Sequence, residues 1–595
     1  MIKRTHTCGE LRASHIGETI SLNGWISKSR DLGGLRFIDL RDRYGKTQIV
    51  FNEELNKEAL AKVKRLGLED VIGIMGVVVA RPDDAKNTNI PTGEIDVEVT
   101  KLVVYNESDP SPFDINDRNS ASEDHRLKYR YLELRTEALQ SNMVMRHKAA
   151  IATRNFMNDG GFIEIETPVL MKSTPEGARD FLVPSRIHKG RFYALPQSPQ
   201  TYKQLLMVSG MDKYFQIVKC FRDEDFRADR QPEFTQIDIE MSFVEQDDVV
   251  ELGTNLTRYL WKSTLGVDLP EAFPEITYYD ALERYGSDKP DTRFGIELNE
   301  FASYVERSEF NAFKSVLDAD GRVKAVVCPN GESYSRKVID ELTDKMKTYY
   351  GAKGLAWMKC KEGVLDGGIS KFFPEDVQKD IISDLSVNDG DIIYIVGDKA
   401  KVVFGALGAL RIELAKRENL IDKNAWAPLW VVDFPLVKWN EDLERWDALH
   451  HPFTSPHPND VKKMDTDPGN IRSLGYDIVM NGCELGGGSI RIHNKDLQAK
   501  IFTLLGISDE DAEEKFGFLM NAFKYGAPPH GGMAFGLDRI VMLLVGSNQI
   551  RDVIAFPKTT SAMSLMDNSP SPVDEKQLDD LHLSIIKETD GKFEN

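Results

Sequence analysis

The first hundred residues alternate hydrophobic and polar positions with a period of two, which predicts β-strands. The expected elements are strands at 19–26, 35–42 and 47–51, a helix at about 54–66, and strands near 71–80 and 94–104. Three strands, a helix and two strands is the order of an OB-fold barrel, a fold that often binds single-stranded nucleic acid. The N-terminal region therefore predicts a small barrel with a candidate nucleic-acid face.

One face of this barrel carries polar and aromatic side chains. Pairing Asp42 with Thr47 across the turn between the second and third strands places Arg41 opposite Gln48. Phe37, Arg41 and Gln48 then share the face away from the apolar positions. An aromatic ring, a cation and an amide suit base stacking and base-edge reading. A solvated strand face without a ligand fits the pattern equally well.

The rest of the chain mixes helical and strand patterns, which predicts an α+β multidomain protein. A polar Pro/Ser-rich stretch after residue 105 has the composition of a linker. A later block lacks the dense polar motifs on either side of it and is expected to be an insertion. The expected divisions are an OB-fold domain at 1–108, a linker or hinge at 109–135, a central domain in two parts at 136–287 and 421–565, an inserted α+β domain at 288–420, and a C-terminal extension at 566–595.

Composition narrows the class of protein. The formal net charge of -20 argues weakly against non-specific nucleic-acid binding, although a structured RNA can still bind through local basic patches. The five cysteines form no Cys-x-x-Cys pair, so neither a zinc knuckle nor a disulfide framework is indicated. No stretch approaches about 20 apolar residues, and the first residues lack an apolar run. A cytoplasmic enzyme is expected, without a membrane or DNA partner.

The first candidate for chemistry is a hairpin that alternates strictly. Ile237, Ile239 and Met241 face one way, whereas Gln236, Asp238 and Glu240 face the other. On the preceding strand, Arg222 alternates in step with Cys220 and Glu224, so its side chain could point toward that polar face. A hairpin this rich in Arg, Asp and Glu favours a functional site over the alternative, an exposed hairpin with surface salt bridges.

The second candidate is a hairpin with Asn481-Gly482 at its turn. A two-residue turn pairs Val479 with Glu484, so Asp477 and Glu484 become diagonal neighbours on one face. Two such carboxylates suit Mg²⁺, which prefers few carboxylates together with phosphate oxygens. Two solvated acids are the alternative. Simple alternation puts Arg491 on the wrong face, so we expect a β-bulge in the run 486–488, where three glycines permit it.

The third candidate is a glycine-rich strand that leads into an apolar helix. Arg539 lies in the first turns of that helix, where a buried cation needs an anionic partner. A nucleotide phosphate and a structural acid both satisfy this need. Lys203 lies on another helix, expected to start with Ser198 as N-cap, and is a candidate for an anionic substrate group. The pair His450-His451 lacks further metal ligands nearby, so zinc is not expected.

Together these motifs resemble the class II aminoacyl-tRNA synthetases, and among them the bacterial aspartyl type, over nearly the whole chain. The segments that carry this resemblance are Gly161–Pro168 (motif 1, a dimer-interface segment), Phe221–Glu224 (motif 2) and Gly536–Arg539 (motif 3). Gln197–Gln200 and Gly486–Arg491 resemble segments specific to the aspartyl and closely related enzymes. The resemblance implies an anticodon-binding barrel, an antiparallel-sheet catalytic domain and a homodimer. Residues 288–420 resemble the extra domain of the bacterial type.

The resemblance also implies the chemistry. ATP and L-aspartate give aspartyl-adenylate, and the aspartyl group then passes to the 3′ end of tRNA, with Mg²⁺ assisting. Arg222 and Arg539 are implied as the catalytic arginines at the phosphates. The implied aspartate contacts are Glu176, Gln200, Lys203, Arg222, Asp238, His450 and Arg491. The implied ATP contacts are Arg222, Asp223, Glu224, Gln231, Glu484, Gly536, Leu537, Asp538 and Arg539. Asp477 and Glu484 are implied as ligands of Mg²⁺, and Arg30, Phe37 and Gln48 as contacts of the anticodon.

Several alternatives stay open at this point. A sister enzyme for asparagine or lysine fits less well, because Lys203 and Arg491 indicate an anionic side chain that would leave both cations unpaired with asparagine. A catalytically inactive tRNA-binding paralogue would be expected to have lost Arg222 or Arg539. A tRNA-independent amide-forming relative would not need the barrel. A relaxed enzyme that also charges tRNA(Asn) is the fourth alternative. Leu32 favours the strict form instead, because the resemblance implies a histidine at this position in many relaxed members.

Overall fold

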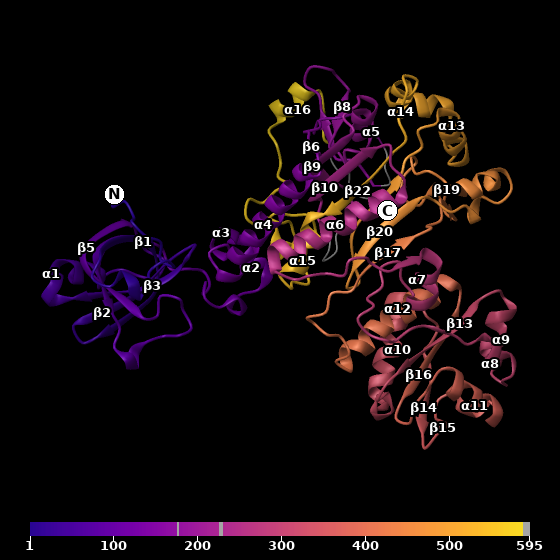
Figure 1. The fold of residues 1–595 in the computed structure, drawn as a ribbon, viewed down its shortest axis with the longest axis horizontal. Helices are drawn as coiled ribbons and strands as arrows, with labels where there is room; N and C mark the ends of the chain where they lie inside the picture. The colour runs from indigo at the N-terminus through magenta and orange to yellow at the C-terminus, as the bar shows by residue number, and fades with distance from the viewer. Residues whose placement is uncertain (175–177, 225–229, 587–595) are drawn as a thin grey trace. The chain divides into compact units, whose positions relative to one another are not determined.

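The computed structural model describes residues 1–174, 178–224 and 230–586. The chain divides into two compact units (Figure 1). The barrel unit consists mainly of residues 1–146 and 549–572, and the sheet unit mainly of residues 147–548. Within the described ranges, no helix has both the length and the apolar character needed to cross a bilayer.

The barrel unit contains the expected closed barrel. Its strands are β1 (Thr19–Leu32), β2 (Leu35–Asp42), β3 (Gly45–Asn52), β4 (Val71–Ala80) and β5 (Ile95–Asn106), with α1 (Glu53–Val63) between β3 and β4. They close in the order β1-β2-β3-β5-β4. Alternate residues of every strand fill the interior, among them Ile20, Leu22, Ile38, Leu40, Ile49 and Val97. The predicted OB-fold is confirmed.

The turn between β2 and β3 is two residues shorter than expected. Asp42 pairs with Gly45 rather than Thr47, and Gln48 lies opposite Asp39 rather than Arg41. The side chain of Asp42 accepts hydrogen bonds from the backbone N–H groups of Tyr44 and Gly45, at 2.8 and 3.2 Å, which tightens the turn. Because the register shifts by two residues, Gln48 stays on the expected face.

Arg41 does not belong to the exposed polar face. It is buried, and its guanidinium lies 2.7 Å from the carboxylate of Glu69, which also accepts a hydrogen bond from Arg135 at 2.9 Å. Removing one partner of a buried ion pair leaves the other charge uncompensated, which costs about 3–5 kcal/mol. Arg41 therefore stabilises the barrel and does not face a ligand.

We expect Arg41→Met to destabilise the barrel by about 3 kcal/mol or more, because Glu69 keeps only the more exposed Arg135 as a partner. Hydrogen exchange of peptides from β1 to β3 measures this loss locally. Arg43→Met is the matched control, because Arg43 lies exposed two residues further on. Equal protection in both variants would refute a structural role for Arg41.

The segment expected to be a linker is folded. It forms a 3-10 helix at Arg118–Ser120 and the short helices α2 (Glu123–Lys128) and α3 (Arg130–Glu133). The buried carboxylate of Glu133 accepts hydrogen bonds from Arg118, Arg126 and Arg130 at 3.1, 2.9 and 2.5 Å. Polar composition suggested a linker because the sequence pattern does not reveal a buried acid with three cationic partners.

The sheet unit is built on an eight-stranded sheet in the order β11-β17-β20-β21-β22-β10-β9-β6. These strands are β6 (Ile163–Glu164), β9 (Lys213–Phe221), β10 (Glu233–Ser242), β11 (Glu275–Thr277), β17 (Pro428–Val432), β20 (Gly475–Met480), β21 (Cys483–Ile490) and β22 (His530–Gly536). Neighbours are antiparallel except at the two ends, where β11 with β17 and β6 with β9 are parallel. Strands from both parts of the predicted central domain thus share one sheet.

Helices surround this sheet and fix its two faces. They are α4 (Glu137–Asp159), α5 (Gln200–Val208), α6 (Gln246–Leu265), α7 (Tyr278–Tyr285), α13 (Lys495–Leu504), α14 (Asp509–Phe523) and α15 (Leu537–Leu544). Helix α6 covers the apolar face, and Gly253 lets it approach the side chains of Trp430 and Met533. The outlying elements are β7 (Leu182–Pro184), β8 (Phe192–Ala194), β18 (Val437–Asn440), β19 (Arg445–Ala448) and α16 (Glu575–Leu581).

The predicted insertion forms a second sheet of its own in the order β12-β13-β16-β14-β15. Its strands are β12 (Asn299–Glu300), β13 (Arg322–Cys328), β14 (Ala356–Lys361), β15 (Val364–Asp366) and β16 (Ile392–Asp398). Helices α10 (Arg336–Tyr350) and α12 (Ala400–Arg417) pack on one face, and α8 (Ala302–Glu306), α9 (Asn311–Asp318) and α11 (Glu375–Asp384) on the other (Figure 1). The segment expected to be an α+β insertion thus folds as a three-layer body.

Candidate active site

The polar face of the sheet carries two fully buried carboxylates, Asp238 and Glu240, on β10. Their strand pairs with β9 and β22 in a regular antiparallel register, so the alternation expected from the sequence holds along β10. Ile237 and Ile239 point into the opposite, apolar face. The family resemblance implies a role for Asp238 but none for Glu240, although the two side chains lie on the same face of β10.

Two cations lie against these carboxylates. The Nζ atom of Lys203, on α5, is 2.8 Å from Asp238 and 3.2 Å from Glu240. The guanidinium of Arg491 donates to both carboxylate oxygens of Glu240, at 3.0 and 3.2 Å. All four side chains are buried, so the site contains an electrically balanced quartet, which we call the charge quartet. Both cations thus have anionic partners within the chain itself, so asparagine in this site would not leave them wholly unpaired.

The two acids of the charge quartet differ in their surroundings. Burial is the largest influence on Asp238 and raises its pKa, despite the opposing effect of Lys203. Burial alone would raise the pKa of Glu240 too, but Arg491 and Lys203 together lower it. Glu240 is thus held as a carboxylate by two cations, whereas Asp238 is the acid that gains most from a further polar partner.

Several buried polar atoms around the charge quartet lack a hydrogen-bond partner within the described residues. They are Oδ2 of Asp238, Nδ1 of His450 and Nε2 of His451. Burial and the nearby cations hold the pKa of His451 well below its ordinary value, so its ring is neutral at pH 7. Unsatisfied buried polar atoms are costly and rare, which indicates a place built for a polar ligand.

The hairpin at Asn481-Gly482 has the predicted register, with Val479 opposite Glu484. The expected β-bulge is present, but it falls at Leu485, one residue before the glycine run, because Ile478 pairs with Gly486. From Gly486 onward the ladder to β22 is regular. The bulge turns the rest of the strand over, and Arg491 reaches the charge quartet as a result.

Asp477 and Glu484 lie on one face of this hairpin. Burial raises the pKa of Asp477, His450 at 3.7 Å opposes this, and the negative charge of Glu484 raises it further. The described residues contain no cluster of three or more potential metal ligands. Two mutually repelling carboxylates nevertheless fit one Mg²⁺ whose remaining ligands are water and phosphate oxygens.

Arg539 lies beside this carboxylate pair. Its guanidinium is 3.5 Å from the Glu484 carboxylate and donates to the Glu484 carbonyl at 3.0 Å. The side chains of Leu537 and Asp538 are buried, and Asp538 accepts a hydrogen bond from the Thr235 N–H at 2.8 Å. Buried in this way, the side chains of Leu537 and Asp538 hold α15 against the sheet.

The remaining predicted positions lie at the end of β9 and the start of α5. Arg222 follows β9 directly, and its guanidinium lies 5.1 Å from the ring centroid of Phe234. Helix α5 begins at Gln200, with Pro199 rather than Ser198 at the N-cap. The backbone of Asp223 forms an isolated β-bridge with Arg179, and Glu224 pairs with Arg230 at 2.7 Å. Gln231 is buried. Glu176 lies outside the described residues.

The barrel brings together the three positions assigned to the anticodon. Arg30 pairs with Phe37 across β1 and β2, and its guanidinium donates to the Gln48 side chain at 2.6 Å. Gln48 in turn donates to Asp96 at 2.9 Å. A cation, an aromatic ring and an amide thus form one contiguous surface on the barrel.

Comparison with known families explains this combination of barrel, sheet and buried charges. Residues 122–560 match the family described as tRNA synthetases class II (D, K and N), and residues 20–105 match the OB-fold nucleic acid binding domain. The chain belongs to the class II tRNA synthetases. As a member, it is a ligase that forms aminoacyl-tRNA and uses ATP as a substrate.

Curated class II synthetases match over almost the full chain. The aspartate–tRNA(Asp/Asn) ligase of Caldanaerobacter subterraneus subsp. tengcongensis is 52% identical and covers 98% of each chain. The aspartate–tRNA ligase of Macrococcus caseolyticus is 52% identical and covers 100% of each. Relatives whose names give tRNA(Asp/Asn) and relatives whose names give no second tRNA are thus equally similar to this chain.

Solved structures support the fold. The asparaginyl-tRNA synthetase of Pyrococcus horikoshii, in complex with asparaginyl-adenylate, aligns over 94% of this chain and 99% of its own with a TM-score of 0.59 and 19% identity. A putative aspartyl-tRNA synthetase from Leishmania major aligns over 93% and 94% with the same TM-score. Both share the architecture described above.

Proposed function

We propose that this synthetase is an aspartate–tRNA ligase, which activates L-aspartate with ATP and transfers it to the 3′ end of tRNA(Asp). The charge quartet carries this proposal, because Lys203 and Arg491 offer two buried cations to an anionic side chain. A lysine substrate would place a third cation beside them. Full-length relatives at 52% identity carry the same activity in their names.

The first step needs no general base, because the α-carboxylate of aspartate is already the nucleophile. One of its oxygens bonds to the α-phosphorus of ATP, and the bond from that phosphorus to the bridging oxygen of pyrophosphate breaks. Arg222 bridges the α-phosphate and the attacking carboxylate, and Arg539 holds the γ-phosphate. Catalysis is thus mainly positioning and charge stabilisation. In the second step the terminal hydroxyl of tRNA attacks the carbonyl carbon and AMP leaves.

Asp477 and Glu484 would hold Mg²⁺, which neutralises phosphate charge when bound. Their shared face and mutual repulsion support this assignment. The other nucleotide contacts are proposed at Asp223, Glu224, Gln231 and the main chain at Gly536.

The aspartate side chain is proposed to join the charge quartet rather than to fill an empty cationic pocket. Its carboxylate shares Lys203 and Arg491 with Glu240 and Asp238. Asparagine lacks the charge to do so and presents an amide N–H₂ to two cations. Rejection of asparagine therefore depends on the donors of Lys203 and Arg491, because a neutral amide gives them weaker hydrogen bonds than a carboxylate does. Gln200, His450 and Glu176 are proposed to close over the amino acid.

ATP–pyrophosphate exchange tests this function directly. Exchange that depends on aspartate, and is far weaker with asparagine and lysine, is expected. Absence of exchange with a properly folded chain would favour an inactive tRNA-binding paralogue. Charging of tRNA(Asp) and tRNA(Asn) transcripts with aspartate then separates the strict enzyme from the relaxed one. We propose the strict form, on the basis of Leu32, which is exposed at the end of β1.

The barrel is proposed to read the anticodon through Arg30, Phe37 and Gln48. Their contiguous surface supports stacking on Phe37 and hydrogen bonding to base edges. The cytoplasm, where tRNA is charged for protein synthesis, is the compartment that this function implies.

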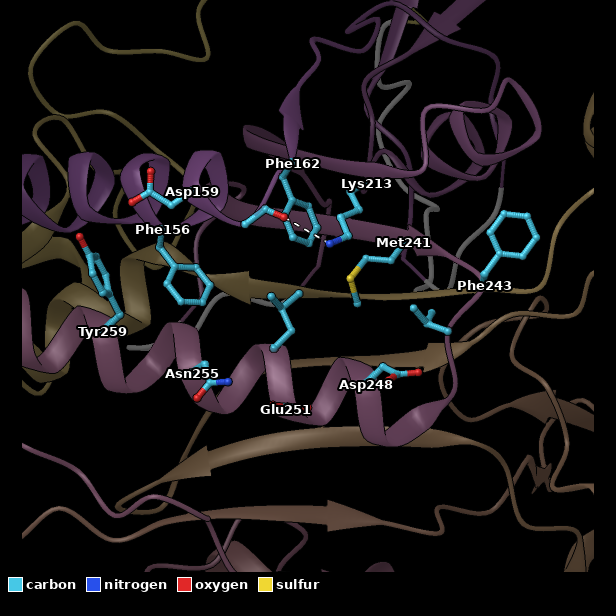
Figure 2. Close-up of a pocket in the computed structure, with 13 residues that line it drawn as sticks. Phe156, Asp159, Phe162, Lys213, Met241, Phe243, Asp248, Glu251, Asn255 and Tyr259 are labelled. Atoms are coloured by element: carbon cyan, nitrogen blue, oxygen red, sulfur yellow. Dashed lines mark hydrogen bonds between the residues drawn. The ribbon is translucent and has the colours of Figure 1, made fainter.

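A second copy of the chain is the proposed occupant of the apolar surface around β6. This strand forms one edge of the eight-stranded sheet. Its own Ile163, and Leu170 in the segment that follows it, are about half exposed. Figure 2 shows a pocket next to this edge, between the end of α4, the strands and α6, where the aromatic rings of Phe156 and Phe162 gather. Phe243 lines the same pocket and is 76% exposed. An exposed edge with contiguous apolar side chains favours pairing with another chain.

We expect Leu170→Asp to weaken self-association by about 100-fold or more, because a carboxylate would be buried without a partner at the interface. Sedimentation or light scattering at decreasing concentration measures the shift to monomer. Tyr349→Asp is the control, since Tyr349 is 74% exposed on the inserted domain. A Leu170→Asp protein that stays dimeric at all concentrations places the interface elsewhere.

A further inference from the structure

The loop that leads from α7 into the inserted domain lies against the hairpin that carries Asp477 and Glu484. A side chain at Gly482, in the hairpin turn, would lie 3.2 Å from the Cβ atom of Asp291. Gly482 has φ of 81°, so the turn already requires glycine, and the missing side chain is also what lets the loop approach. The inserted domain thus touches the hairpin at its tip.

Charged side chains fix this loop firmly to the inserted domain. Arg293 donates to both carboxylate oxygens of Asp291, at 2.9 and 2.7 Å. The Asp291 carbonyl accepts from Arg411 at 3.0 Å. Arg411 is buried in α12 and lies over the rings of Tyr285 and Phe294, at 5.0 and 4.4 Å from their centroids. The position of the loop is therefore set by the core of the inserted domain.

This fixed loop places a lysine beside the proposed magnesium ligand. Nζ of Lys289 lies 3.9 Å from Oε2 of Glu484, whereas Arg539 approaches the other oxygen, Oε1, at 3.5 Å. The Lys289 side chain is 43% exposed, so its flexible end is free to move by several ångströms. An exposed pair at this distance stabilises the fold little, so its contribution to stability does not explain why the held loop presents Lys289 to this hairpin.

We propose that Lys289 is a ligand for the triphosphate of ATP, and for pyrophosphate as the leaving product, supplied by the inserted domain. This proposal rests on the proposed function of the same site. With Glu484 engaged by a divalent cation, the Lys289 ammonium would pair instead with the phosphates, which carry the largest negative charge in the site. Arg539 and Lys289 then flank the phosphates from the two sides of Glu484.

Binding measurements on the full-length protein test the role of Lys289 apart from turnover. Calorimetry with a non-hydrolysable ATP analogue and with inorganic pyrophosphate, each with Mg²⁺, is expected to show about tenfold weaker binding by Lys289→Met. Lys289→Arg should keep most of the affinity, and the KM for aspartate should stay unchanged in both variants. Lys353→Met is the matched control, because Lys353 makes a similar pair with Asp398, at 3.8 Å, elsewhere in the inserted domain.

The opposite sign of effect would overturn the proposal. If Lys289 only neutralised the Glu484 carboxylate, it would compete with Mg²⁺ for that group. Its removal would then lower the Mg²⁺ concentration needed for nucleotide binding and leave the affinity for pyrophosphate unchanged. Unchanged binding of both ligands would also reject it. Failure of the proposed function is a separate result, because the wild-type protein would then show no aspartate-dependent exchange at all.

Discussion

Arg222→Ala is expected to lower aspartate-dependent ATP–pyrophosphate exchange by about 10²–10³-fold, mainly through kcat. Arg222 is proposed to bridge the α-phosphate and the attacking carboxylate, where negative charge concentrates as the new bond forms. A donor aimed at developing charge in a water-poor site contributes about this much to the rate. Steady-state exchange with ATP and aspartate varied separately measures the effect on kcat and on each KM.

Two further variants make this result specific. Lys219→Ala removes a cation on β9, shortly before Arg222 and of opposite parity. Lys219 is half exposed and lies 3.8 Å from Glu233, so its removal should leave exchange unchanged. Arg222→Lys keeps the charge but loses the planar fork that contacts two oxygen groups at once, so only part of the rate should return. An unchanged kcat in the Arg222→Ala protein would mean that Arg222 does not contact the reacting phosphate.

Strong local signals accounted for much of this architecture. The Asn481-Gly482 turn gave the correct register of its hairpin, because this dipeptide strongly favours a two-residue turn. The strict alternation along β10 likewise identified the polar face on which Asp238 lies. In both cases the deciding interactions involve residues close together in sequence.

Interactions between distant residues explain what the sequence pattern missed. The buried partner of Arg41 is Glu69, 28 residues away, so nothing in β2 itself marks Arg41 as internal. Glu240 meets Arg491 across 251 residues and only because Leu485 forms a bulge between them in the fold. Alternation predicts which face a side chain occupies, but not which charge from another element will be its partner.

The buried pairing of Arg491 with Glu240 leads to the second large expected effect. Arg491→Met should abolish detectable aspartate activation, a loss of about 10³-fold or more, because both the substrate carboxylate and Glu240 lose their main cation. The same change should lower the free energy of unfolding by about 3–5 kcal/mol, since Glu240 is fully buried. Activity alone therefore does not separate binding of substrate from maintenance of the fold.

The double variant Arg491→Met/Glu240→Gln separates the two roles. Glutamine removes the uncompensated charge, so the melting temperature should recover toward that of the wild type, while aspartate-dependent exchange stays lost. Arg445→Met, at an exposed arginine paired with Asp447, controls for the removal of an arginine as such. If the double variant regained exchange to within about tenfold of wild type, Arg491 would be a structural partner of Glu240 rather than a contact for aspartate. The charge quartet would then stabilise the sheet, and recognition of the aspartate side chain would fall to Lys203.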